Sequence, residues 1–227
     1  MDGGKGRVVK DRYSILVGLF FVAIVAVALI NGVPGDGGGT LGLDEQPPRW
    51  PLPEFAVPVA AGDLEGDANI AQDDCSAAAL PCPGDARRTP ACQLRTPGAI
   101  RVCDLFDRPS VISFWFSRGG SECVDQQDVV SRVYSRYRGR VSFLSLDIRD
   151  DRDTVRELIR RRGWQMPVGY DRDGAVASLY RVGLCPTFAY AYPGGTLESA
   201  GIGNLTVGEL SDRVEHLLHA SRAAEGG

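Results

Sequence analysis

Two cysteines, Cys123 and Cys185, stand in sequence contexts that suit thiol–disulfide exchange. Cys123 follows an apolar run, residues 114–116, and a glycine-containing turn, so it lies at the expected start of a helix. Cys185 precedes Pro186 and another apolar run. The thiolate is the attacking species in disulfide exchange, and the free N–H groups and positive dipole end of a helix start stabilise it. The pKa of Cys123 is therefore expected to lie below the usual thiol value of about 8.5.

Charged neighbours act on Cys123 in both directions. Glu122 and Asp125 oppose a thiolate by like-charge repulsion, whereas Arg118 favours it. The alternative role for Cys123 is that of a structural half-cystine. A histidine-based mechanism is not expected, because the only two histidines lie near the carboxyl end of the chain.

The other cysteines are expected to form structural disulfides: Cys75, Cys82, Cys92 and Cys103. A turn sequence at 96–98 separates Cys92 from Cys103, so a hairpin would bring these two together. Cys75 and Cys82 are near enough in sequence to close a small loop. No C-x-x-C pair is present in the sequence, so neither a metal site nor another cofactor is expected.

The amino-terminal segment predicts a membrane anchor. Residues 15–30 are apolar and uncharged, and basic residues precede them. With Tyr13 and Ser14, this run approaches the length of about 20 residues that crosses a bilayer. The basic flank places the amino terminus in the cytoplasm and the rest of the chain outside. A cleavable signal peptide is the alternative, because residues 26–28 have the A-x-A pattern; under either alternative, disulfides persist in that compartment.

Composition shifts divide the chain into segments. These are a cytoplasmic basic tail at 1–13, a transmembrane anchor at 14–31, a Pro/Gly-rich linker at 32–52, a globular domain at 53–222 with a cysteine-rich insertion at 72–98, and a tail at 223–227. The net charge of −4 argues against nucleic acid as a partner.

Hydrophobic periodicity predicts an α/β domain. Strands are expected at 110–116, 141–147, 187–192 and 196–201, and helices at 123–138, 153–162, 174–180 and 206–222. Thr206 and Glu209 form a capping-box pattern at the start of the last helix. This order implies a mixed sheet with helices on both faces.

The order of these elements, with a proline just before the third of these strands, resembles the thioredoxin fold. Residues 50–222 resemble membrane-anchored TlpA-type thiol–disulfide oxidoreductases and the related alkyl hydroperoxide reductase/thiol-specific antioxidant group. The segments that carry the likeness are 53–58, 103–115, 166–174 and 180–188. The resemblance implies that Pro186 is cis and that the residue before it faces the helix-start cysteine. It therefore implies that Cys123 and Cys185 lie within disulfide range.

The resemblance also implies a groove for a protein substrate. Its expected residues are Trp115, Arg118, Gly120, Pro186 and Thr187. The active-site motif departs from the family, because the segment Gly120-Ser-Glu-Cys123 supplies only the second cysteine of C-x-x-C. Cys123 also stands where peroxiredoxins have their peroxidatic cysteine, but Phe116 and Gly120 replace the proline and threonine of that motif.

The resulting hypothesis is an extracytoplasmic, membrane-anchored thiol–disulfide oxidoreductase. Cys123 would attack a disulfide of a protein partner, and Cys185 would resolve the mixed disulfide in place of the missing cysteine. The sequence names neither the substrate nor the electron donor. The alternatives are a non-catalytic, disulfide-stabilised thioredoxin-like binding module and a peroxiredoxin-like peroxidase.

Overall fold

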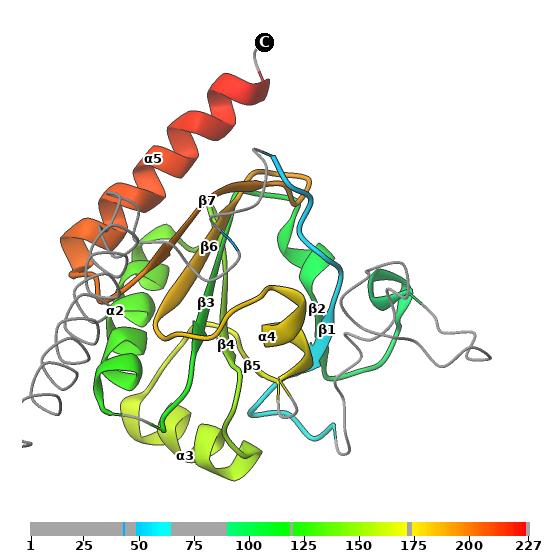
Figure 1. Cartoon of the computed structure of the whole chain (residues 1–227), viewed down its shortest axis with the longest axis vertical. Coiled ribbons are helices and arrows are strands. Elements are labelled where there is room, and N and C mark those ends of the chain that lie inside the picture. Colours follow the sequence, from blue (N-terminus) through cyan, green and yellow to red (C-terminus); the bar gives the residue numbers. More distant parts are fainter. Residues whose placement is uncertain (1–42, 44–48, 65–89, 119, 172–173, 226–227) are drawn as a thin grey trace, which may run out of the picture. The chain divides into compact units, whose positions relative to one another are not determined.

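The computed structural model describes residues 43, 49–64, 90–118, 120–171 and 174–225 (Figure 1). The expected tail and anchor at 1–31, and the cysteines Cys75 and Cys82, lie outside these residues. Within the described ranges, no helix is both long and apolar enough to cross a membrane.

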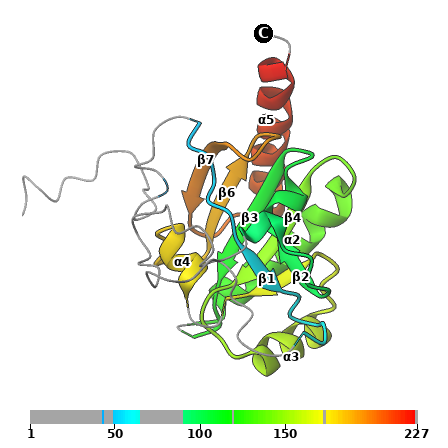
Figure 2. The ribbon, with the colours of Figure 1, turned by 90° about the vertical axis from the view of Figure 1, so that its right-hand side faces the viewer.

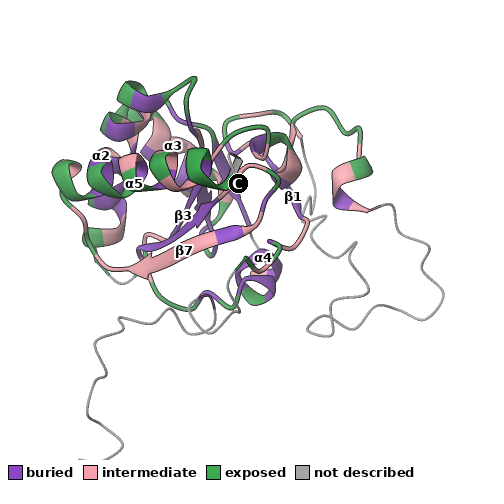
Figure 3. Cartoon of the chain, turned by 90° about the horizontal axis from the view of Figure 1, so that it is seen from above, coloured by how far each residue is buried: buried purple, intermediate pink, exposed green. Residues whose placement is uncertain are grey.

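A mixed five-stranded sheet forms the centre of the described domain, with the strand order β5-β4-β3-β6-β7. Strands β3, β4 and β5 run parallel, and β6 and β7 continue the sheet in antiparallel pairs. The strands are β3 (Ser110–Trp115), β4 (Ser142–Asp147), β5 (Val168–Tyr170), β6 (Thr187–Ala191) and β7 (Leu197–Ile202). Every residue of the central strand β3 is buried, whereas most of the edge strand β7 is half-buried (Figure 3).

Two hydrophobic cores cover the two faces of this sheet. Alternation along β3 sends Val111 and Trp115 into one core and Ile112 and Phe114 into the other. The first core is completed by α2 (Glu122–Tyr137), α3 (Arg152–Arg162) and α5 (Val207–Glu225), and the second by α4 (Ala175–Leu179). The predicted α/β fold with helices on both faces is therefore confirmed.

A small antiparallel sheet lies over the face that carries α4 (Figure 2). It pairs β1 (Ala56–Pro58) with β2 (Ala99–Arg101), and two short 3-10 helices, η2 (Ala91–Gln93) and η3 (Val102–Leu105), flank β2. Gly169 of β5 lies so close to Val57 that an added Cβ would be 2.7 Å from Val57 Cγ2. A glycine at this position therefore lets β1 pack closely on the main sheet.

The expected boundaries of the domain and its elements need two corrections. Trp50 accepts a hydrogen bond from Leu197 N at 2.8 Å and Leu52 donates one to Gly195 O at 2.8 Å, so the end of the predicted linker is part of the domain. Strands β2 and β5 were not predicted, because three residues are too few to show alternation. The capping box is confirmed by reciprocal bonds between Thr206 and Glu209.

Candidate functional site

The sheet topology brings Cys123 and Cys185 together. Cys123 is the second residue of α2, the helix that follows the carboxyl end of the central strand β3. Cys185 precedes β6, which runs antiparallel to β3, so the start of β6 lies beside the end of β3 and Thr187 pairs with Phe114. Cys123 and Cys185, far apart in sequence, therefore meet where the inner strand β3 ends and its neighbour β6 begins.

Cys123 and Cys185 form a disulfide across a sequence separation of 62, with their Cα atoms 5.7 Å apart. Both residues are half-buried, so each keeps some surface exposed to solvent. The peptide bond between Cys185 and Pro186 is cis, as the family resemblance implied. No cysteine in the described part of the chain is free.

Hydrogen bonds hold the loop around Pro186 in place. The Thr187 hydroxyl donates to Leu184 O at 2.7 Å, and Gly203 N donates to Pro186 O at 3.0 Å. Leu184 is 47% exposed and is the only large hydrophobic side chain of the described residues that is exposed. An apolar contact point therefore stands directly beside the disulfide.

Some of the residues expected to line the groove are exposed, and the others are buried in the domain. Arg118 and Gly120 are exposed beside Cys123. Gly120 has a φ of 139°, which residues with a Cβ rarely adopt. The prediction that Trp115 lines the groove is wrong: its side chain is fully buried and donates to Ser145 Oγ at 2.8 Å. Pro186 and Thr187 are buried as well, so they shape the loop without offering side-chain surface.

The segment between β3 and α2 contacts the disulfide directly. Phe116 O lies 4.0 Å from Cys185 Sγ. Ser117 N donates to Asp150 Oδ2 at 2.5 Å, and Arg118 Nε lies 3.7 Å from Asp150 Oδ1. A cavity of about 380 Å³ opens beside Phe116 and reaches the loop before Cys185; its other lining residues include Ile148, Arg149, Val182 and Gly183.

The charges near Cys123 are partly neutralised by neighbours. Asp125 forms an ion pair with Arg162 at 2.8 Å, and Glu122 accepts a long hydrogen bond of 3.5 Å from Asn204. Ser121 precedes the helix but makes no side-chain capping bond. The first N–H groups of α2 therefore remain available to a thiolate at Cys123.

Two buried carboxyl groups behind the loop were missed by the sequence analysis. Asp147 is fully buried and Asp150 is 2% exposed. Burial, followed by the adjacent Asp150 carboxyl group, raises the pKa of Asp147 to about 8, against the opposing effect of the backbone N–H donors of Asp150 and Arg149. The acid-rich stretch 147–153 is visible in the sequence, but such runs are usually solvated, so it gave no sign of burial.

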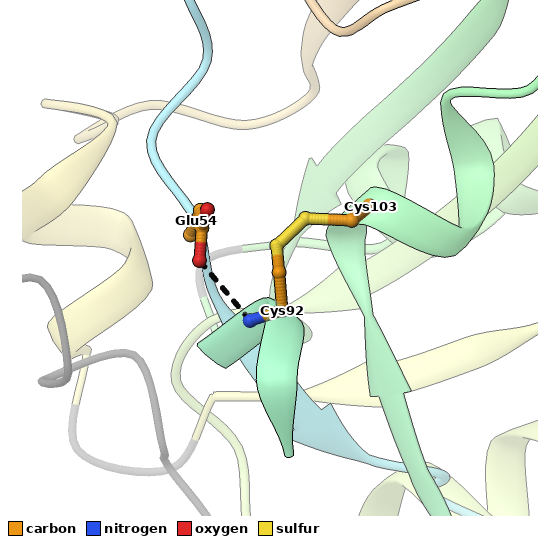
Figure 4. A group of neighbouring side chains, drawn as sticks. All are labelled: Glu54, Cys92 and Cys103. Atoms are coloured by element: carbon orange, nitrogen blue, oxygen red, sulfur yellow. Dashed lines mark hydrogen bonds between the residues drawn. A yellow bond between two sulfur atoms is a disulfide. The ribbon is translucent and has the colours of Figure 1, made fainter. Parts of the chain in front are cut away.

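A second disulfide joins Cys92 to Cys103, with Cα atoms 5.8 Å apart and a sequence separation of 11 (Figure 4). Glu54 Oε2 accepts a hydrogen bond from Cys92 N at 3.1 Å. The ligand atoms of these three residues lie within 4.8 Å of one another. Because the two sulfur atoms are bonded to each other, the cluster offers a metal no thiolate in this state.

The chain is similar in sequence to a known thiol–disulfide oxidoreductase. No family model matches the chain. Thiol-disulfide oxidoreductase ResA from Oceanobacillus iheyensis is 25% identical over 121 residues, which cover 53% of this chain and 60% of ResA, less than two thirds of its length.

Two solved structures from Chlorobium tepidum superpose on the domain. A candidate DsbE-type thiol:disulfide interchange protein gives a TM-score of 0.56 at 14% identity, covering 77% of this chain and 99% of that one. A thiol:disulfide interchange protein of the thioredoxin family gives 0.54 at 12% identity, covering 76% and 99%. The domain therefore has a thioredoxin-like fold, and the resemblance to thioredoxin-like thiol–disulfide oxidoreductases is confirmed.

Proposed function

We propose that this protein is a thiol–disulfide oxidoreductase that uses the Cys123–Cys185 pair. The observation that carries the proposal is the disulfide itself, which joins a helix start to the residue before a cis-proline. The helix start stabilises a thiolate at Cys123, and both cysteines are half-buried, so a partner can reach them. The similarity to ResA and to thiol:disulfide interchange proteins supports the same reaction class.

The reduced pair would reduce a disulfide in a protein partner in two steps. The Cys123 thiolate attacks one partner sulfur; the partner S–S bond breaks, a mixed disulfide forms and one partner thiolate leaves. The Cys185 thiol then loses its proton and its thiolate attacks Cys123 Sγ. This step forms the Cys123–Cys185 bond and releases the second partner thiolate, so two electrons pass to the partner and each partner thiolate takes up a proton. A dithiol donor restores the pair by the reverse exchange.

The surface around the disulfide suits a protein partner. Exposed Leu184 offers an apolar contact next to Cys185, and the cavity beside Phe116 extends to the neighbouring Gly183. Arg118 and Gly120 extend this surface next to Cys123. The proposed site is extracytoplasmic and is tethered to the membrane by the apolar segment at 14–31. An oxidised cysteine pair persists in that compartment.

Trapping tests this proposal. In Cys185→Ser, the resolving thiol is absent, so Cys123 should stay bound to its partner in a mixed disulfide that appears as a shifted band on a non-reducing gel. Cys103→Ser is the matched control, because it also leaves one unpaired cysteine but in the other bridge. Unlinked monomer alone in Cys185→Ser, or equal trapping in both variants, would overturn the proposed mechanism.

A non-catalytic binding module is the second candidate. It is favoured by the absence of C-x-x-C and by the fact that both cysteines are already bonded. Insulin reduction in the presence of dithiothreitol and the reduction potential of the Cys123–Cys185 bond separate the two functions. A potential below about −300 mV would mark a structural bridge.

A further inference from the structure

The carboxyl groups of Asp147 and Asp150 form a buried pair at the carboxyl end of β4. Asp147 Oδ1 accepts hydrogen bonds from Arg149 N at 3.1 Å and Asp150 N at 2.8 Å. Asp147 Oδ2 is buried and receives no hydrogen bond from any described donor. A proton on Oδ2 converts this atom into a donor, and the Asp150 carboxylate is its acceptor.

Asp150 connects this pair to the disulfide. It accepts from Ser117 N and lies within ion-pair distance of Arg118, so it holds the two residues that follow Phe116. Phe116 O in turn lies against Cys185 Sγ, where it would accept a hydrogen bond from the reduced thiol. The segment 116–118 therefore contacts both the sulfur of Cys185 and the carboxyl group of Asp150.

We propose that Asp147 and Asp150, joined by the proton of Asp147, act as positioning residues that hold segment 116–118 against the Cys123–Cys185 disulfide. Ionisation of Asp147 places a second negative charge beside Asp150. The repulsion weakens the hold of Asp150 on Ser117 and Arg118, so the disulfide becomes more accessible to an attacking thiolate. This inference rests on the proposed function only in treating Cys123–Cys185 as the reactive bond.

Burial of a carboxylic acid that stays protonated near neutral pH costs stability, which makes such a group a candidate for a functional role. The other charged groups around the pair have contacts of their own. Arg149 stacks on the Phe116 ring, and Arg152 donates to Leu64 O at 2.6 Å. Asp151 accepts from Thr154 N, and Asp171, after β5, accepts from Ala177 N. Arg118 is the cation that faces Asp150.

The test is the rate at which dithiothreitol reduces Cys123–Cys185 between pH 6 and pH 9. The reaction is quenched by alkylation, the peptides that carry the two cysteines are counted by mass spectrometry, and each rate is divided by the thiolate fraction of the reductant. In the unmodified protein, the normalised rate should rise as Asp147 ionises, by about fivefold, the factor that the loss of one ordinary hydrogen bond gives.

Variants distinguish the effect of the Asp147–Asp150 pair from the effects of other acidic residues. Asp147→Asn keeps a donor toward Asp150 but cannot ionise, so its normalised rate should stay at the low-pH value throughout. Asp153→Asn, which changes a carboxylate with a side chain that is 93% exposed, should keep the profile of the unmodified protein. In Asp150→Asn the rise should be lost, because no carboxylate at position 150 remains for ionised Asp147 to repel, while the amide oxygen still offers an acceptor for Ser117 N.

The outcomes decide between the two proposals. A flat profile in the unmodified protein, or an unchanged rise in either Asp147→Asn or Asp150→Asn, would overturn the role of the carboxyl pair and leave the exchange reaction intact. The expected profiles together with no trapped partner in Cys185→Ser would support the pair and overturn the proposed function. A bond that resists dithiothreitol in the folded protein at every pH would overturn both.

Discussion

The two disulfides among the described residues have similar Cα separations but lie in different surroundings. Their Cα separations are 5.7 Å for Cys123–Cys185 and 5.8 Å for Cys92–Cys103. The first joins the start of a long helix to the loop before a central strand, beside exposed Leu184. The second joins two short 3-10 helices, where a carboxylate accepts from a backbone N–H of the bridge itself.

The surroundings of each disulfide, and not the distance that it spans, therefore determine the role expected of it. A helix start supplies unpaired N–H groups and a positive dipole end to a departing thiolate at Cys123. At Cys92 the backbone N–H already donates to Glu54, so this donor is not available to a thiolate. We therefore expect exchange at one bridge and structural support from the other.

The largest expected effect is on exchange activity. Cys123→Ser should reduce the rate of insulin reduction to the background given by dithiothreitol alone, because no other described cysteine stands at a helix start of this kind. The double variant Cys92→Ser/Cys103→Ser should keep most of the rate at a temperature at which it is folded. Equal losses in the two variants would remove the distinction between the bridges.

Loss of either disulfide should lower the free energy of unfolding. In the chain-entropy model, opening a bridge with a sequence separation of 62 costs about 4 kcal/mol, and opening one with a separation of 11 costs about 3 kcal/mol. Urea unfolding of Cys123→Ser/Cys185→Ser and Cys92→Ser/Cys103→Ser, each against the oxidised protein, measures these losses. A Cys92–Cys103 bridge that contributes nothing to the free energy of unfolding would contradict its assignment as a structural brace.

The sequence predicted the parts of the fold that have long hydrophobic patterns. The strand at 110–116 is recognisable because it is a mostly apolar run, and the amphipathic helix at 206–222 because apolar residues recur at helical spacing over several turns. The prediction for Trp115 failed for a different reason. Its position beside the motif is a property of the sequence, but its burial depends on Trp164 and Ser145, which reach it only in the folded sheet.

The candidate site was predictable to the same extent: local sequence identified some of its residues, whereas burial in the folded sheet determines the others. The two half-cystines were identified from their local contexts and the family resemblance, and the strand register then places them together. Asp147 and Asp150 could not be separated from their exposed neighbours by sequence. What distinguishes them is the position of β4 between β3 and β5, which removes the end of the strand from water.

The pH dependence of stability provides the next test. The pKa of Asp147 is raised from 3.8 to about 8, so between these values the folded protein holds a proton that the unfolded chain has released. The contribution of Asp147 is therefore fully present below about pH 3.8 and is lost as the pH rises toward about 8. The free energy of unfolding should fall by up to about 1.4 kcal/mol per pH unit from this group.

Asp147→Asn should remove this slope, because an amide does not titrate. Urea unfolding at several pH values between 5 and 8 measures the slope in the unmodified protein, in Asp147→Asn and in the exposed control Asp153→Asn. Parallel pH profiles in all three proteins would show that Asp147 titrates at its ordinary value when folded. That result would also remove the physical basis for coupling the carboxyl pair to the disulfide.

The smallest expected effect concerns the Cys92–Cys103 disulfide and the hydrogen bond that Glu54 accepts from it. Glu54→Ala removes the acceptor of Cys92 N and should lower the free energy of unfolding by about 1–2 kcal/mol, the usual cost of leaving a partly buried donor unpaired. Glu54→Gln keeps an oxygen acceptor and should cost less than Glu54→Ala. Insulin reduction should be unchanged in both variants, because Glu54 bonds to the other bridge. A fall in activity comparable with that of Cys123→Ser would instead show that the Glu54–Cys92–Cys103 cluster takes part in exchange, and the two disulfides would then form one redox system.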